Sequence, residues 1–256
     1  SVSRVKGSGD PDFIIGDLPV AIHESVEITL DRPQIYVGEG LGGYAVVGAS
    51  RDEVDYTDQD QGTQAVRYAD IGGEGGVQLR SMFRKAAFAL RFGQIEPLIS
   101  NFITDDSRLL YVRDIRDRVE MLAPFLHFDA DPYPVLVDGR IVYIVDGYTT
   151  TDRYPYSQRA DVAWLPRDSG LRHRLNYVRN SVKAVVDAFS GGVTFYVSEP
   201  DDPLIIAYQG AFGGLFTPMA EMPASLVEHI RYSEDLFRIQ SELWGAYHID
   251  DTENFY

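Results

Sequence analysis

The sequence contains no cysteine among its 256 residues. Disulfide frameworks, thiol nucleophiles and zinc sites with cysteine ligands are therefore excluded. Positive charge is scarce as well, because 23 Lys and Arg stand against 39 Asp and Glu and the formal net charge is −16. A protein that binds duplex nucleic acid must neutralise phosphates with Lys and Arg, so the composition argues against a nucleic-acid partner.

Long apolar segments are also missing. The longest uncharged stretch, residues 203–220, is interrupted by three glycines and two prolines. It predicts a short helix and a loop rather than a bilayer span. The chain begins at Ser1 without an initiator methionine and ends at Tyr256 after an acidic run. We therefore expect a water-soluble piece of a longer protein.

The composition is otherwise that of a folded globular chain, with 45% apolar and 24% charged residues. Residues 1–12 are rich in Gly, Ser, Asp and Pro and are expected to be disordered. We expect an N-terminal α+β part over residues 13–125 and a hairpin-and-helix part over residues 126–256, with one continuous domain as the alternative. The polar stretch 52–64 is expected to be an exposed loop.

Two β-hairpins give the strongest local signal. Residues 133–137 and 140–145 are apolar runs joined by Asp-Gly, a dipeptide typical of a type I′ turn. Residues 181–189 return as 193–197 across a Ser-Gly-Gly turn. Both faces of the first hairpin are apolar, which favours a central position covered on both sides. We predict an α+β fold in which a mixed, mainly antiparallel sheet is built on these two hairpins and helices pack over it.

Helical periodicity predicts a helix over residues 77–92 and a second over 114–121, the latter ended by a proline. Further helices are expected to begin at Pro203, at Pro223 and at Ser233. The apolar stripe of the first helix consists of Leu79, Met82, Phe83, Ala86, Ala87 and Leu90, and the inward residues of the second are Ile115, Val119 and Leu122.

Residues 146–157 form the most unusual segment, because carboxylates, an arginine, tyrosines and threonines follow a strand that we expect to be buried. Loops at strand ends often carry function. Asp146 and Asp152 could form the acid/base pair that glycosidases use, with tyrosines stacking on a sugar. The alternative is a structural turn in which Asp152 pairs with Arg153. The candidate ligand-binding residues are Tyr148, Thr150, Arg153, Tyr154, Tyr156 and Arg179.

Carboxylates close together in loops also suit calcium, which takes six to eight oxygen ligands. Asp129 and Asp131 are the candidate metal ligands. No EF-hand pattern accompanies them, and the alternative is that they are turn and cap residues. Calcium is the one cofactor that the sequence suggests.

Positive charge is concentrated despite the acidic total, with Arg80, Arg84, Lys85 and Arg91 on the first predicted helix. Such a basic face could meet anionic lipid headgroups or an acidic polymer of the cell envelope. The alternative is that these residues pair with some of the chain's many acids at the surface, where each pair is worth about 0–1 kcal/mol.

Three long motifs resemble the signature of uncharacterised protein family 0182, a group of bacterial multi-pass membrane proteins. They are VDGRIVYIVDGYTTTDRYPYS at 137–157, NYVRNSVKAVVDAF at 176–189 and GLFTPMAEMP at 214–223. The last motif continues through residues 229–237. The likeness extends over most of the chain from about residue 13.

The resemblance implies a location more than a chemistry. Its members look like a bundle of membrane helices followed by a large extracytoplasmic region, to which this chain would belong. The expected localisation is the extracytoplasmic face of the cell membrane, with membrane contact through helices outside this chain. The resemblance supplies no activity and no catalytic residue. We expect a non-enzymatic module for envelope binding, sensing or assembly, with an envelope hydrolase or a calcium-dependent binding module as alternatives.

Overall fold

The predicted α+β class is confirmed by the structure, a computed structural model in which helices accompany mixed, mostly antiparallel sheets. No helix in the part of the chain that it describes is both long and apolar enough to cross a bilayer. The described residues are 3–5, 11–13, 15–16, 21–22, 30–58, 62–66, 68, 72–95 and 100–247.

The chain divides into two compact units, each assembled from separate segments. Our sequence-based boundary near residue 125 stays a prediction. Unit 1 comprises residues 1–114, 136–141 and 187–192, and unit 2 comprises residues 115–135, 142–186 and 193–256.

In the residues that the structure describes, unit 1 is built from short antiparallel strand pairs and the helix α1. Strand β9 lies between β5 and β8 in a three-stranded sheet. The polar stretch expected to be an exposed loop instead forms the hairpin β6–β7. Strands β1 and β2 pair near the start of the chain. The elements are β1 (Ser3–Val5), β2 (Pro11–Phe13), β3 (Ile15–Gly16), β4 (Ala21–Ile22), β5 (Tyr44–Val47), β6 (Glu53–Asp58), β7 (Gly62–Val66), β8 (Val77–Gln78), α1 (Met82–Phe92) and β9 (Arg108–Tyr111).

Three aromatic rings form a core of unit 1. Tyr36 meets Tyr68 and Phe189 edge-on, with centroids 4.7 and 5.5 Å away, and Tyr68 stacks on Phe189 at 5.2 Å. A β-carbon on Gly73 would lie 2.3 Å from the Tyr68 ring. The glycine-rich loop before α1 is therefore explained by close packing on an aromatic side chain.

Helix α1 is shorter than predicted and turns a different face inward. It begins after Ser81, whose hydroxyl accepts a hydrogen bond from the Phe83 N–H group, and ends at Gly93 with a φ of 66°. Phe88 packs against the Tyr111 ring and Phe92 against the Tyr44 ring. Most of the predicted apolar stripe is exposed, and only its Leu79, which precedes the helix, is buried.

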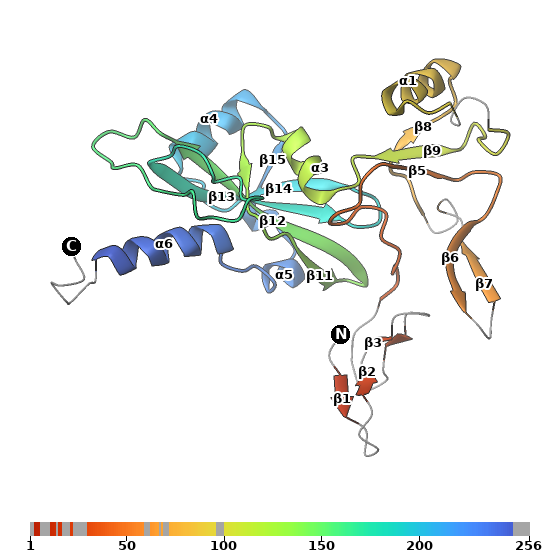
Figure 1. Cartoon of the computed structure of the whole chain (residues 1–256), viewed down its shortest axis with the longest axis horizontal. Coiled ribbons are helices and arrows are strands. Elements are labelled where there is room, and N and C mark those ends of the chain that lie inside the picture. Colours follow the sequence, from red (N-terminus) through yellow and green to blue (C-terminus); the bar gives the residue numbers. More distant parts are fainter. Residues whose placement is uncertain are drawn as a thin grey trace. The chain divides into compact units, whose positions relative to one another are not determined.

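Unit 2 contains most of a six-stranded sheet with the order β10-β12-β13-β14-β15, in which β11 also pairs with β12. In Figure 1, α4 lies above these strands and α6 below them. The remaining elements are α3 (Ile115–Leu122), β10 (His127–Phe128), β11 (Tyr133–Val137), β12 (Arg140–Thr151), β13 (Tyr177–Asp187), β14 (Val193–Val197), α4 (Pro203–Ala211), β15 (Phe216–Pro218), the 3₁₀ helix η1 (Met219–Glu221), α5 (Ala224–Val227) and α6 (Glu234–Tyr247).

Both predicted hairpins are confirmed. Asp138 and Gly139 have φ angles of 50° and 71°, as a type I′ turn requires. The second strand of that hairpin is longer than predicted, because β12 continues to Thr151. Every residue from Tyr143 to Thr149 is buried, so the start of the supposed loop at residue 146 is a central strand covered on both sides.

The helices of unit 2 begin close to where the sequence places them. Asp202 caps α4 by accepting a hydrogen bond from the Leu204 N–H group, and Pro203 occupies the first turn. Helix α3 buries Ile115 and Val119, as predicted, whereas Leu122 is exposed at the helix end.

Candidate functional site

The polar centre of unit 2 is a buried ion pair between neighbouring strands. Lys183 of β13 donates from Nζ to Oδ1 of Asp146 in β12, and the two side chains are 6% and 4% exposed. The Nζ group also donates to the backbone oxygen of Arg231 at 3.2 Å. Burial raises the pKa of Asp146, and the Lys183 ammonium group opposes that rise. Because an unpaired buried charge is costly, each member needs the other.

A second buried carboxylate, Asp129, connects helix α6 to the sheet. Its Oδ2 atom accepts from the Asp235 N–H group at 3.0 Å and from the Tyr148 hydroxyl. In return, Asp235 Oδ2 accepts from the Ala130 N–H group at 3.1 Å. Burial, together with the charge of Asp129, raises the pKa of Asp235. Asp129 thus caps the first turn of α6 from a different part of the chain.

Two buried polar atoms beside this cluster lack a hydrogen-bond partner of good geometry within the described residues. They are Ser233 Oγ and Asp235 Oδ1. Their residues are 2% and 1% exposed. Both residues nevertheless have polar neighbours, because the Tyr148 hydroxyl interacts with Ser233 and Ser169 interacts with Asp235. Ser233 also lines the pocket described below.

The predicted calcium ligands lie in this cluster, but their oxygens serve other contacts. Asp129 Oδ1 accepts from the Asp131 N–H group at 3.0 Å, which is the turn role considered as the alternative. Burial, followed by the nearby Glu234, raises the pKa of Asp131. In the described ranges, no group of three or more His, Asp or Glu residues is arranged to hold a metal ion.

A third buried carboxylate, Asp202, organises the other end of the two long strands. Its oxygens accept from the Ser181 hydroxyl at 2.6 Å, the Tyr177 hydroxyl at 2.6 Å and the Thr149 hydroxyl. Burial opposes ionisation, but these hydrogen bonds and that from the Leu204 N–H group outweigh it and lower the pKa of Asp202. This carboxylate therefore fixes α4 against the sheet.

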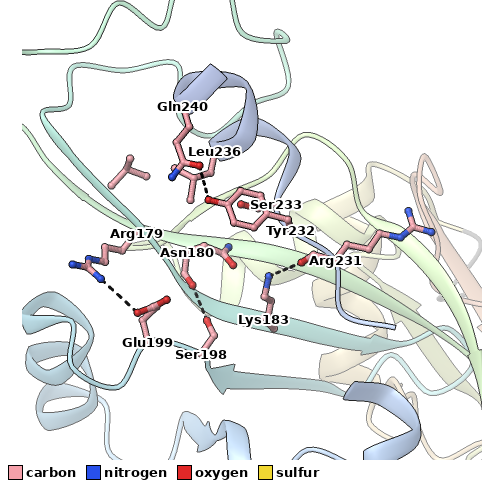
Figure 2. Close-up of a pocket in the computed structure, with 11 residues that line it drawn as sticks. Arg179, Asn180, Lys183, Ser198, Glu199, Arg231, Tyr232, Ser233, Leu236 and Gln240 are labelled. Carbon is pink, nitrogen blue, oxygen red and sulfur yellow. Dashed lines mark hydrogen bonds and ion pairs between the residues drawn. The ribbon is translucent and has the colours of Figure 1, made fainter. Parts of the chain in front are cut away.

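A pocket of about 510 Å³ lies between β13 and the start of α6. Figure 2 shows Arg179, Asn180 and Lys183 on the strand side, and Tyr232 and Gln240 on the helix side. The pocket is of the size that small-molecule sites have. Its other lining residues are Val178, Ser198, Glu199, Arg231, Ser233 and Leu236.

The pocket contains several hydrogen-bond donors beside one carboxylate, that of Glu199. Lys183 uses two of its three N–H donors, and Gln240 accepts through Oε1 from the Tyr232 hydroxyl at 2.6 Å, which leaves its amide N–H groups as donors. Arg179 lies 3.5 Å from Glu199 in an exposed ion pair that a ligand could rearrange. The Arg231 guanidinium turns away from the pocket and stacks over the Tyr133 ring at 4.5 Å.

Asp146 and Asp152 do not form the close pair that the hydrolase hypothesis needs. They are six residues apart along a segment that is extended as far as Thr151, which separates them by roughly 20 Å at ~3.3 Å per residue. Glycosidase pairs are about 5–10 Å apart. Asp152 lies 3.9 Å from both Arg153 and Arg159 in exposed ion pairs.

The remaining predicted ligand residues are dispersed. Tyr148 is fully buried against Asp129, so a ligand cannot reach it. Tyr154 stacks on Tyr177 at 5.3 Å, whereas Arg153 and Tyr156 are exposed beyond the strand end. Of these candidates, Arg179 alone lines the pocket.

Two stacked histidines lie at the edge of the sheet. The rings of His127 and His173 are 4.0 Å apart. His173 contacts the Gly170 carbonyl through Nδ1 and the Thr150 hydroxyl through Nε2, each at 2.9 Å. The carbonyl requires a donor, so Nδ1 carries a proton. Burial and the neighbouring His173 lower the pKa of His127 to about 4.

Apart from Arg179, sequence reasoning missed the residues that line the pocket. Lys183 lies within an apolar run predicted to be a strand, and a lysine there requires a buried partner. That signal was available, but it did not identify Asp146 as the partner. The contributions of Ser233, Leu236 and Gln240 depend on where α6 docks, which no local pattern gives.

A family profile described as "Uncharacterised protein family (UPF0182)" matches residues 1–256 of the chain. The UPF0182 protein of Geobacter sulfurreducens is 43% identical over 256 residues, which cover 100% of this chain and 27% of that protein. Those of Desulforamulus reducens and Methanospirillum hungatei are 41% and 40% identical, over 26% and 27% of their own lengths. The chain thus spans about a quarter of the length of these relatives. No solved structure matches it.

Proposed function

Since the chain belongs to the uncharacterised protein family UPF0182, we propose its function from its own geometry: it is a binding module in the extracytoplasmic part of a membrane protein. The pocket of unit 2 takes a small, oxygen-rich anionic molecule, such as a sugar acid or an organic acid. The module senses or captures this molecule without transforming it.

The observation that carries the proposal is the donor-rich pocket between β13 and α6. Ligand oxygens can accept from Lys183 at the floor and from Gln240 on the helix side. Ser233 lines the pocket as well, but its Oγ atom is buried beside the Tyr148 hydroxyl, so it shapes the floor and does not contact the ligand. Arg179 supplies a positive charge at the rim.

A binding role fits the buried carboxylates better than a hydrolytic one. Asp146 holds Lys183, Asp129 caps α6 and Asp202 accepts from several hydroxyl groups. Each of these groups is committed to the fold. The distance from Asp146 to Asp152 also leaves the hydrolase alternative without its second carboxylate.

Thermal unfolding tests the pocket, because a ligand that binds the folded state raises the melting temperature. The probes are glucuronate, malate and glycerol 3-phosphate, with glucose and glycerol as neutral counterparts. We expect at least one anionic probe to raise the melting temperature of the chain. The variants Arg179→Gln and Gln240→Ala should weaken that effect, whereas Arg174→Gln, an exposed arginine outside the pocket, should retain it.

A shift that persists in both pocket variants, or no shift with any anionic probe, would contradict the proposed ligand class. If only the neutral probes act, the pocket binds polyols and the anionic part of the proposal fails.

The extracytoplasmic location is supported by the resemblance of the three long motifs, and about three quarters of each relative's length remains for other segments. Because this chain contains no cysteine, a single cysteine introduced into it can be compared with the unsubstituted protein. Tyr156→Cys, at a fully exposed position, is introduced into the whole protein and treated with a membrane-impermeant maleimide. Labelling of intact cells above the level of the unsubstituted protein is expected. Labelling only after lysis would refute the location.

A further inference from the structure

Helix α1 of unit 1 carries an exposed apolar face. Met82, Phe83 and Leu90 are 63%, 89% and 86% exposed, and Ala86 and Ala87 beside them are also exposed. At 100° per residue these five side chains occupy one continuous arc of the helix. Residues on the opposite side pack on the neighbouring strands, next to which α1 lies in Figure 1.

Positive charge accompanies this arc. Residues 77–94 contain four Lys and Arg and no Asp or Glu, in a chain whose net charge is −16. Arg84 and Arg91 are exposed, and the helical wheel places them together at one edge of the apolar arc. Arg80 is exposed just before the helix.

We propose that α1 docks on an anionic lipid bilayer, with its apolar arc in the headgroup region and its arginines on lipid phosphates. Interfacial helices combine these two features. Long arginine side chains at the edge of an apolar arc can reach phosphate groups while their stems remain in the apolar zone.

Charge complementarity selects this partner. An anionic surface repels an acidic chain in general, and α1 is a patch without acid through which the chain can approach it. A second copy docked on the same arc would bring the arginines of two helices together, which is unfavourable. The inference uses residues of unit 1 only, so it stands or fails independently of the pocket.

Co-sedimentation with vesicles tests the proposal on the whole 256-residue chain. Vesicles of phosphatidylglycerol and phosphatidylcholine in equal parts should bind the chain at low salt, and binding should weaken as salt is raised. Vesicles of phosphatidylcholine alone should bind it much less. Equal binding to both kinds, or to neither, would overturn the proposal.

Two double variants separate the contribution of the apolar side chains of α1 from that of its arginines. Replacing Phe83 and Leu90 by serine should abolish binding, and replacing Arg84 and Arg91 by glutamine should weaken it by about fivefold for each arginine. The controls are serine at Ile206 and Val227, which are 53% and 44% exposed on other helices, and glutamine at the exposed Arg167 and Arg174. If the controls lose binding equally, α1 is not the docking site.

Analytical ultracentrifugation without lipid distinguishes the competing occupant. A monomeric chain is expected at micromolar concentration. A dimer that the two serine substitutions in α1 convert to a monomer would show that this face binds a second copy, and would overturn the lipid assignment.

Discussion

The ammonium group of Lys183 and the carboxylate of Asp146 form an ion pair that is almost completely shielded from water, between the two longest strands of the fold. Desolvating both charges is expensive, and their mutual attraction repays it only while both are present. We therefore expect the pair to specify how β12 and β13 meet rather than simply to add stability.

Lys183→Met should destabilise unit 2 by about 3–5 kcal/mol, because it leaves Asp146 buried without its partner. The double variant Asp146→Leu/Lys183→Met should recover most of that loss. Denaturant unfolding followed by circular dichroism measures both. Arg238→Met, which breaks the exposed pair with Glu234 on α6, is the control and should cost less than about 1 kcal/mol. If the single and double variants lose the same free energy of unfolding, the loss does not come from leaving Asp146 without its partner, and the prediction is wrong.

Asp202→Asn should destabilise the fold at neutral pH by about 1–3 kcal/mol, since the ionised carboxylate accepts from several hydroxyl groups at once. The pKa of Asp202 is lowered by folding, so its contribution is complete above the ordinary carboxyl value of 3.8 and is lost as the pH falls through the lower folded value. Unfolding of the wild type and the variant across this range should therefore converge at acid pH. A constant difference would contradict the assignment.

His127 should make the fold sensitive to mild acid. Its pKa falls from 6.5 to about 4 on folding, so the unfolded chain takes up the proton first as the pH drops between these values. Stability is lost over that window by roughly 2 kcal/mol, allowing for partial exposure of the ring. His127→Gln should reduce this loss relative to the wild type, and the exposed His229→Gln should not. Melting temperatures at pH values across the window measure the effect.

Two glycines offer a matched pair of alanine substitutions. A β-carbon on Gly170 would lie 2.6 Å from the Phe128 nitrogen and 2.7 Å from the Phe128 oxygen, and backbone atoms cannot move aside as a side chain can. Gly170→Ala should cost about 1–3 kcal/mol or more. Gly210, inside α4, has no atom within 4 Å of such a carbon, so Gly210→Ala should stabilise by about 0.5–1 kcal/mol. Chemical denaturation of both variants measures whether the change in free energy of unfolding has opposite signs, and a loss of similar size in both would contradict the prediction.

Features governed by neighbouring residues were predictable from the sequence. The Asp138-Gly139 turn needs only its own two φ angles and the apolar runs beside it. The start of α4 after Asp202 likewise follows from one cap and one proline. Such signals involve only a few neighbouring residues, so they can be recognised in a single sequence without knowledge of the fold.

Features that depend on residues far apart were not predictable. Asp129 and Asp235 are linked although 106 residues separate them, and the Lys183 side chain finds Asp146 at a separation of 37 residues. The face of α1 that turns inward was also undetermined, because both faces carry large apolar side chains and periodicity does not say which one meets the strands. β12 continues past Asp146 because its polar side chains are satisfied by other elements.

The way α6 is attached to unit 2 suggests how binding of a ligand in the pocket could be observed. Its first turn is held by the hydrogen bonds between Asp235 and residues 129–130, and Ile239 is buried. The residues from Gln240 to Gly245 are exposed. The helix is thus anchored at one end, and the far half should exchange its amide hydrogens quickly. Leu236 and Gln240 line the pocket. A ligand bound there would contact the helix at a second point, and slower deuterium uptake along α6 would show that the ligand has bound.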